Sequence, residues 1–184
     1  MPGVCPSSGI PFSVSVTTEA ELKNFLDCAN RSPSQSFTFG LLEHIPLTNP
    51  WWSTFALLVG RGDRQKVTVS LAGAKPGVSY TELIGPGSLG SFGIFYVLEG
   101  AELNMKYLLL REGFRDSSGG AVYNRGTVYI EWSWLRDNRA GGTLGAGGAI
   151  YNNGKMVLYR CVLYGNMATG DGGVSRSIVG LETG

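Results

Sequence analysis

The segment between residues 119 and 166 carries the same pattern twice, and this repeat constrains the fold more than any other feature. Each copy opens with Gly-Gly-Ala, an aliphatic residue, Tyr and Asn, and each closes with Leu-x-x-Asn. The copies start at Gly119 and Gly147 (147 − 119 = 28). They end at Asn138 and Asn166 (166 − 138 = 28), so the offset is the same at both ends. A fixed period of this length predicts one supersecondary unit stacked on a copy of itself.

A third segment, residues 103–113, extends the pattern when Leu103 is aligned with Val128. Small or apolar residues then fill four columns: Leu103, Val128 and Met156; Met105, Ile130 and Leu158; Leu108, Ser133 and Cys161; and Leu110, Leu135 and Leu163. Gly113, Asn138 and Asn166 form a fifth column, which ends each unit. Such columns are expected in a coil where each residue packs on its equivalent one rung away, at about 4.8 Å along the axis.

The earlier part of the chain consists of short apolar runs between turn residues. The runs are 37–39, 41–47, 55–59, 67–71, 80–84, 94–98 and 103–110. No segment between them is long enough for a helical crossover, which leaves an antiparallel sandwich or a parallel coil. An antiparallel meander has no need of near-identical segments that recur at a nearly constant spacing. The repeat therefore predicts an all-β chain folded as a single-stranded parallel β-helix, or solenoid.

The N-terminal part contains the one clear helix signal. Thr18 and Glu21 form a capping box,. Apolar residues then follow at helical spacing: Leu22, Phe25, Leu26 and Ala29,. We expect this short helix to cover the first coil. The predicted parts are a flexible leader at 1–11, a parallel β-helix domain at 12–184, a capping helix at about 18–30 and regular repeats at about 101–177.

Charge and cysteine content bear on the class of protein. The 15 Lys and Arg residues nearly balance the 14 Asp and Glu residues, so nothing favours a nucleic-acid partner,. No apolar run approaches the ~18 residues of a transmembrane segment, and the first residues do not form a signal peptide. Cys5 and Cys28 could pair in an oxidising compartment, and we expect Cys161 to be a small core residue. No Cys/His spacing suggests zinc, and we expect neither a metal nor a cofactor.

The asparagines and glycines of the repeat are interpreted as structural. Asn138 stacks on Asn166, and Asn124 stacks on Asn152. Asparagine tolerates left-handed turns, and its amide can bond both its own turn and the next rung. We therefore predict asparagine ladders rather than ligand sites, and we interpret the glycine pairs as turn residues.

The paired motifs resemble the repeats of chlamydial polymorphic outer membrane proteins, where Gly-Gly-Ala-(Ile/Leu/Val) is paired with Phe-x-x-Asn. Residues 119–122 and 147–150 match the first motif, and 135–138 and 163–166 match the second with Leu in place of Phe. The part before Leu110 is similar to the start of a pectate-lyase-like β-helix. The resemblance implies a right-handed parallel β-helix in an adhesin-like protein. It also implies an extracellular or cell-surface location and a carbohydrate or a host cell-surface protein as partner.

Outward side chains give the first candidate site. If the four apolar columns point inward, the residues between them form an aromatic patch on one side of the rod. The candidate ligand-binding residues are Tyr107, Tyr129, Trp132, Trp134, Tyr159 and Arg160. Exposed aromatic clusters often mark binding surfaces, and flat rings beside charged groups suit sugar faces. A covering loop or partner chain is the structural alternative.

Two carboxylates give the alternative, a polysaccharide lyase or glycoside hydrolase. Glu112 and Asp137 occupy one column on adjacent rungs, with Arg111 and Arg136 beside them. Two carboxylates about 5 Å apart can act as acid and nucleophile in a retaining glycosidase. Carboxylates beside arginines are more often solvated ion pairs, so we favour a non-catalytic protein.

Two further features are weaker. Arg61-Gly62-Asp63 matches an integrin-recognition tripeptide, but Gly-Asp is also ordinary turn chemistry,. The last repeat, from Gly172, lacks its Asn. This degraded end is compatible with end-to-end self-association or with a truncated product that has no independent activity.

Overall fold

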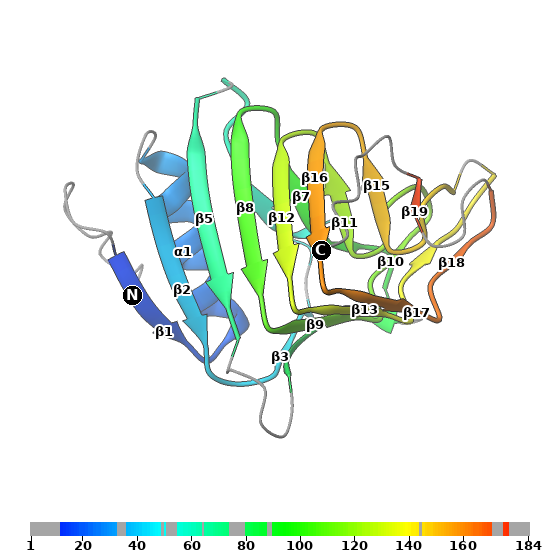
Figure 1. Ribbon diagram of the computed structural model, residues 1–184, viewed down its shortest axis with the longest axis horizontal. Helices are drawn as coiled ribbons and strands as arrows, with labels where there is room; N and C mark the ends of the chain where they lie inside the picture. The colour runs from blue at the N-terminus through cyan, green and yellow to red at the C-terminus, as the bar shows by residue number, and fades with distance from the viewer. Residues whose placement is uncertain are drawn as a thin grey trace.

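The structure is a computed structural model, and it describes residues 12–32, 36–48, 50, 55–63, 65–73, 80–87, 90–143, 145–170 and 175–176. These residues form a parallel β-helix of about five turns with one α-helix near the N-terminus (Figure 1). The predicted fold class, a single-stranded right-handed parallel β-helix with a short N-terminal capping helix, is confirmed. Every strand pairing in the described chain is parallel, and each pairing joins equivalent parts of neighbouring turns.

Three main sheets and one short sheet make up the coil. The first sheet contains β1 (Phe12–Val16), β2 (Ser36–Leu41), β5 (Val67–Ala72), β8 (Ala101–Lys106), β12 (Thr127–Glu131) and β16 (Lys155–Tyr159). The second contains β3 (Ile45–Pro46), β6 (Thr81–Ile84), β9 (Leu108–Arg111), β13 (Trp134–Arg136) and β17 (Val162–Tyr164). The third contains β4 (Phe55–Val59), β7 (Gly93–Val97), β11 (Val122–Asn124), β15 (Ile150–Asn152) and β19 (Ser175–Arg176). The short fourth sheet contains β10 (Phe114–Arg115), β14 (Arg139–Ala140) and β18 (Met167–Ala168).

The register confirms the columns expected from the sequence. Val128 pairs with Leu103 and Met156, and Leu135 pairs with Leu110 and Leu163. The offset between paired residues increases between β14 and β15. Phe114 pairs with Arg139 (139 − 114 = 25), whereas Val122 pairs with Ile150 (150 − 122 = 28). The three extra residues therefore lie in the connection from the fourth sheet to the third, and the register on either side is kept.

The inward columns form one continuous core. Val128, Ile130, Ser133 and Leu135 are fully buried, while the residues between them face outward. Full burial of a large aliphatic side chain stabilises the fold by about 1.5–3 kcal/mol. Ser133 is the polar exception, and its hydroxyl is satisfied. It accepts a hydrogen bond from Leu108 N (3.1 Å) and donates one to Glu131 O (2.7 Å).

The helix α1 (Glu19–Arg31) lies beside the first turns, against β4 and β5 (Figure 1). Its capping box is formed as predicted, since Glu21 N donates to Thr18 Oγ1 (3.2 Å) and Thr18 N donates to Glu21 Oε2 (3.3 Å). The predicted apolar face is buried, with Leu22, Leu26 and Ala29 fully covered. Burial of this face therefore covers the core at the first turns, which confirms the expected role of the helix.

The end of the helix is tied to the coil by a polar side chain. Asn30 Nδ2 donates to Leu58 O (3.0 Å), and Gly60 N donates to Asn30 Oδ1 (2.7 Å). Both atoms of this buried amide are therefore satisfied, as burial of a polar group requires. Cys28, on the same helix, is part of a disulfide. Cys5, its expected partner, lies outside the described residues.

Both asparagine ladders are present, but the reason given for them from the sequence is wrong in part. Asn138 Nδ2 donates to Asn166 Oδ1 (3.0 Å), and Asn124 Nδ2 donates to Asn152 Oδ1 (2.6 Å). None of these asparagines has a left-handed backbone. The left-handed residue precedes Asn138, where Asp137 has φ 54°. The asparagines themselves point inward and satisfy buried backbone groups.

Some predictions concern residues outside those described. The flexible leader at 1–11 and the last residues of the 12–184 domain are among them. Within the range of about 101–177 predicted for regular repeats, β18 (Met167–Ala168) pairs with β14, and Ser175–Arg176 of β19 pairs with β15. In the described residues, no helix is both long enough and apolar enough to span a membrane.

Candidate functional site

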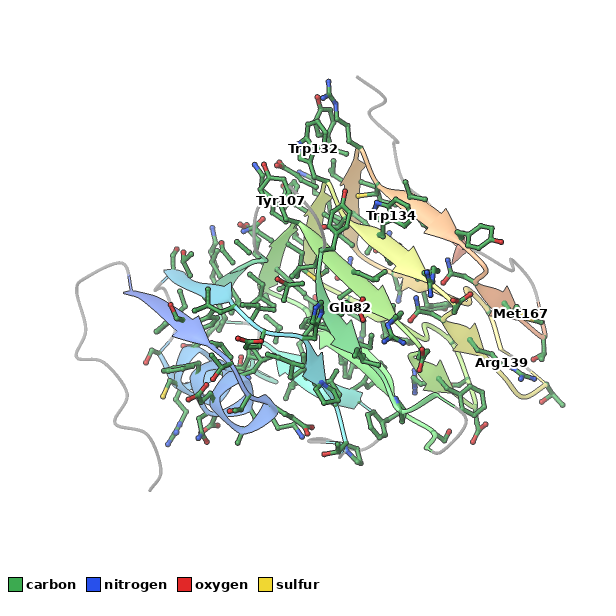
Figure 2. The ribbon with its side chains drawn as sticks, turned by 90° about the horizontal axis from the view of Figure 1, so that it is seen from below. Glu82, Tyr107, Trp132, Trp134, Arg139 and Met167 are labelled. Carbon is green, nitrogen blue, oxygen red and sulfur yellow. The ribbon has the colours of Figure 1, made fainter. Side chains whose placement is uncertain are left out.

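The corner between the first and second sheets is built from three large residues in a left-handed conformation. Tyr107, Trp132 and Arg160 have φ values of 57°, 47° and 52°. They occupy equivalent places on successive rungs, directly after or beside the ends of β8, β12 and β16. A left-handed conformation costs a non-glycine residue about 1–2 kcal/mol. At this turn the bulky side chains lie on the outside of the coil, as Figure 2 shows for Tyr107 and Trp132.

Cation–ring and ring–ring contacts connect the side chains at this corner. Trp132 meets Tyr159 edge to face, with ring centroids 6.3 Å apart. The Arg160 guanidinium lies over the Trp132 ring at 4.4 Å and over the Tyr159 ring at 5.2 Å. Lys106 Nζ lies 5.1 Å from the Tyr107 ring centroid. These contacts fix the orientation of the rings, each cation–ring pair contributing about 0.5–1 kcal/mol at an exposed position.

Trp134 lies next to this corner and does not belong to it. It belongs to β13, where it pairs with Leu109 and Val162 on the outer face of the second sheet. Its side chain is 37% exposed, and its ring lies 5.8 Å from that of Tyr80. The structure thus brings Trp132, Tyr159 and Arg160 together, and it places Trp134 on the neighbouring face.

A pocket of about 310 Å³ lies beside the corner, on the outer face of the first sheet. It is lined by Ser70, Leu71, Ala72, Asn104, Met105, Lys106, Tyr129 and Glu131. The hollow exists because β5 carries small outward residues, Ser70 and Ala72. Their partners on the next rung, Asn104 and Lys106, are longer. Of the six aromatic and basic residues predicted as a site, only Tyr129 lines this pocket.

The polar groups of the pocket are partly paired and partly free. Lys106 Nζ lies 3.3 Å from Glu131 Oε2, and the hydrogen bond to Glu131 is the main cause of a raised pKa at Lys106. Asn104 Nδ2 donates to Glu102 Oε1 (3.1 Å). Asn104 Oδ1 and the Tyr129 hydroxyl have no hydrogen-bond partner within the described part of the chain. Two hydrogen-bonding groups are therefore available to a ligand.

Asn104, Lys106 and Ser70 were missed by the reasoning from sequence. A signal for two of them was present in the alignment of the repeats. The alignment of Leu103 with Val128 also places Lys106 opposite Glu131, and opposite charges directly across neighbouring strands form a stabilising pair,. The same alignment places Asn104 opposite Tyr129. Ser70 lies on a rung with no recognisable repeat motif.

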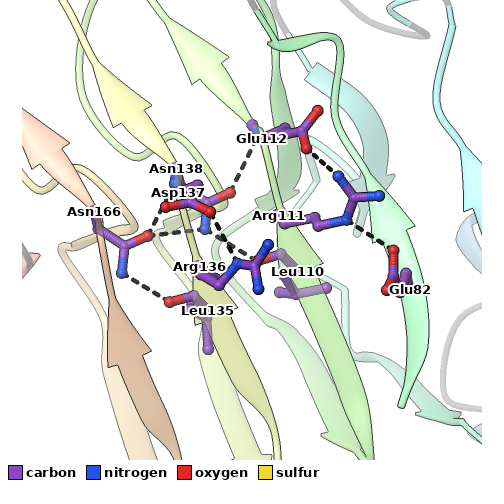
Figure 3. A network of polar contacts seen from close by, with 10 residues as sticks. Glu82, Leu110, Arg111, Glu112, Leu135, Arg136, Asp137, Asn138 and Asn166 are labelled. Atoms are coloured by element: carbon purple, nitrogen blue, oxygen red, sulfur yellow. Dashed lines mark hydrogen bonds and ion pairs between the residues drawn. The ribbon is translucent and has the colours of Figure 1, made fainter. Parts of the chain in front are cut away.

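Glu112 and Asp137 occupy equivalent positions at the next corner, as predicted, with φ values of 59° and 54°. They lie in a second pocket, of about 230 Å³. Each is paired with the arginine before it. Glu112 contacts Arg111, and Asp137 Oδ2 accepts from Arg136 Nε at 2.8 Å (Figure 3).

The two carboxylates lean away from each other along the axis. Glu112 Oε2 lies beside Gly87 on the preceding rung, whereas Asp137 Oδ1 lies beside Gly165 on the following rung. A retaining glycosidase needs two carboxyl groups facing one ligand. Divergent carboxylates that are half-exposed and paired with arginines have the geometry of surface ion pairs,.

The Arg61-Gly62-Asp63 tripeptide follows β4. Arg61 Nε lies 3.1 Å from Asp63 Oδ2, so the two charged side chains pair with each other. A receptor that reads an Arg-Gly-Asp turn would have to separate them first. This geometry gives no support to the tripeptide as a recognition site.

The third sheet carries an aromatic cluster that was not predicted. Tyr123 lies between Tyr96 and Tyr151, at centroid distances of 5.2 and 4.9 Å. Arg115 covers Phe55 at 4.2 Å and Tyr123 at 5.4 Å. Burial lowers the pKa of Arg115 and raises the pKa of Tyr123. The Arg115 guanidinium is itself largely covered, whereas Arg160 at the first corner is exposed, so we interpret the cluster on the third sheet as packing.

The described residues contain no group of three or more His, Cys, Asp or Glu side chains placed to hold a metal ion. Comparisons of the chain with protein-family models, with curated proteins and with solved structures gave no match.

Proposed function

We propose that this protein is a non-catalytic β-helix scaffold that binds a saccharide at the corner between the first and second sheets. The observation that carries the proposal is that an aromatic corner and a polar pocket lie next to each other on the first sheet. Trp132, Tyr159 and Arg160 form a fixed aromatic and cationic corner. The residues that precede the left-handed corner positions, Lys106 and Glu131, line the adjacent pocket.

The chemistry of the two features suits a sugar. Saccharide rings present C–H groups on their faces and hydroxyls at their edges, so they need aromatic surface beside hydrogen-bonding groups. Ligand sites commonly combine apolar and aromatic lining with a few placed polar groups. Tyr129 supplies a ring, and Asn104 Oδ1 supplies an unused acceptor. Left-handed residues that carry bulky side chains also cluster at binding sites more often than elsewhere.

An extracellular or cell-surface location is part of the proposal, as is the adhesin-like role. Support comes from the disulfide at Cys28, because disulfides persist mainly in oxidising compartments,. The Gly-Gly-Ala and Leu-x-x-Asn motifs remain a resemblance to surface β-helix repeats. The proposal rests on the corner and the pocket and does not depend on that resemblance.

A glycan array, probed with the full chain, tests the proposal. We expect the wild-type protein to bind a subset of glycans, and binding to fall at least about tenfold in Trp132→Ala, because the stacking of a sugar face on the ring is lost. Trp134→Ala tests whether the second-sheet face contributes. Tyr164→Ala is the matched control, since Tyr164 is a 67% exposed aromatic residue on β17.

The outcomes separate the alternatives. Binding that survives Trp132→Ala would refute the corner as the site, and a loss in Trp134→Ala alone would place the site on the outer face of the second sheet. A protein that binds no glycan but binds a cell-surface protein, with loss in Trp132→Ala, would replace the saccharide with a protein ligand. A fall in Tyr164→Ala equal to that in Trp132→Ala would show a non-specific effect of removing surface rings.

A further inference from the structure

The charges that line the pocket of the first sheet cancel one another. Lys106 and Glu131 are the only charged members of the eight described residues around it, and they form an ion pair. The other polar members, Ser70, Asn104 and Tyr129, are uncharged. Building on the proposed function, we infer that this pocket takes one ring of an uncharged saccharide and discriminates against acidic saccharides.

The shape of the pocket suits a single ring. Ser70, Asn104 and Tyr129 form one outward column across β5, β8 and β12, so side-chain size increases from rung to rung. Ala72 and Ser70 form the low floor, and Tyr129 forms the high wall. The volume of about 310 Å³ lies at the lower end of the range for small-molecule sites, which is roughly 300–1,000 Å³,.

The ion pair presents a donor beside an acceptor. Lys106 Nζ and Glu131 Oε2 are 3.3 Å apart, and neighbouring hydroxyls of a sugar can each donate and accept a hydrogen bond. One hydroxyl can donate to the carboxylate while the next accepts from the ammonium, so the pair need not be broken. Asn104 Oδ1 can accept from a third hydroxyl. Hydrogen bonds to charged groups are roughly twice as strong as those between neutral groups.

An acidic sugar would be repelled at the same position in the pocket. Its carboxylate or sulfate would have to approach Glu131, or displace Glu131 from Lys106. Among the described residues of the same sheet and corner there are two other cations, but neither lines the pocket. Lys155 Nζ lies over the Tyr129 ring at 5.6 Å, and Arg160 lies over the Trp132 ring at 4.4 Å. Repulsion by Glu131 therefore acts as the element that rejects the wrong ligand.

Calorimetric titration with two sets of trisaccharides tests the inference. The first set contains glucose, mannose and galactose trimers, and the second contains the corresponding uronic acid trimers. We expect the best neutral trimer to bind about tenfold or more tightly than any acidic trimer. We also expect little change in the neutral affinity between low and high salt, because only charged ligands are screened.

A charge substitution provides the sharper test. Glu131→Gln leaves Lys106 without its carboxylate, so acidic trimers are expected to gain about five- to tenfold in affinity relative to neutral ones. The matched control is Asp27→Asn, which removes the carboxylate of the Asp27–Arg31 ion pair on α1. This control should leave the ratio of the two affinities unchanged. Circular dichroism spectra of both variants should match the wild type.

The results distinguish failure of the inference from failure of the proposed function. Tighter binding of acidic than neutral trimers to the wild type overturns the inference alone. An affinity ratio unaffected by Glu131→Gln does the same, if binding is still lost in Trp132→Ala. If no saccharide of either class binds, in the titrations or on the array, the proposed function fails and the inference fails with it.

Discussion

Asn138 is the residue whose replacement tests the architecture most directly. It is fully buried, and its amide serves three backbone or side-chain groups. Gly113 N donates to Asn138 Oδ1 (3.0 Å), while Asn138 Nδ2 donates to Leu110 O (3.0 Å) and to Asn166 Oδ1 (3.0 Å). The side chain therefore joins three successive rungs (Figure 3).

Asn138→Ala is expected to lower the free energy of unfolding by about 2–5 kcal/mol, an estimate that follows from the groups left behind. The Gly113 N–H loses its acceptor, and an orphaned buried donor costs about 1–3 kcal/mol. Leu110 O loses a donor, and the amide–amide bond to Asn166 is lost at about 0.5–1.5 kcal/mol. Asn166 Oδ1 keeps one partner, because Asn138 N also donates to it (3.0 Å).

Urea unfolding, followed by far-ultraviolet circular dichroism and by tryptophan fluorescence, measures the change. Asn153→Ala is the control, because Asn153 is an exposed asparagine of the next repeat copy, and its change should stay within about 0.5 kcal/mol,. A loss for Asn138→Ala no larger than that of the control would refute the reasoning, since it would mean that the ladder contributes nothing to stability.

Three further predictions concern the glycines, the helix and the carboxylates. Gly147→Ala should lower the free energy of unfolding by more than about 2 kcal/mol in the same urea assay, because φ is 64° and the new methyl group would overlap Ile150 O,. Gly62→Ala is the control, because the space around Gly62 is open, and its change should stay within about 0.5 kcal/mol,. Burial tends to raise the pKa of Glu19, but hydrogen bonds from Lys23 and Thr48 outweigh it and lower the pKa below the ordinary 4.5. The stability that Glu19 contributes is therefore present above pH 4.5, and it is lost as the pH falls through the lowered pKa,. The free energies of unfolding of the wild type and Glu19→Gln should therefore differ at neutral pH and converge in acid. Incubation with pectin, alginate and chitin fragments should give no products by mass spectrometry, and turnover that disappears in Glu112→Gln would establish the enzyme instead.

The regular part of the fold could be predicted because each rung packs on its own copy. Residues that face the core must then be equivalent from rung to rung, and this places Val128, Leu135 and Asn138 in visible columns. The helix was predictable because its cap and its apolar face are local in sequence. Earlier rungs showed no such columns, since Val69 pairs with Leu103 (103 − 69 = 34) and the connections there differ in length.

The corners and the pocket were harder to foresee. A left-handed position normally shows itself as glycine or asparagine, but Tyr107 and Trp132 occupy it here. The sequence therefore shows 103–110 as a single apolar run without glycine or proline, and the structure divides it into β8 and β9 at Tyr107. The pocket depends on Ser70 and Ala72 being small relative to their neighbours on the next rung. That is a property of the stacked sheet, and no single segment carries it.

The three extra residues between β14 and β15 indicate how a chain of this kind can change during evolution. The connection from Ala140 to Ile150 is longer than the one from Arg115 to Val122, yet the pairings before and after it keep their register. Gly142 and Thr143 are the exposed residues of this connection among those described, and lengthening the chain at an exposed loop has only a small entropic cost,. Insertions at this joint can therefore accumulate without altering which side chains enter the core. The joint is also a natural place to graft a foreign loop, with the rungs on both sides left intact.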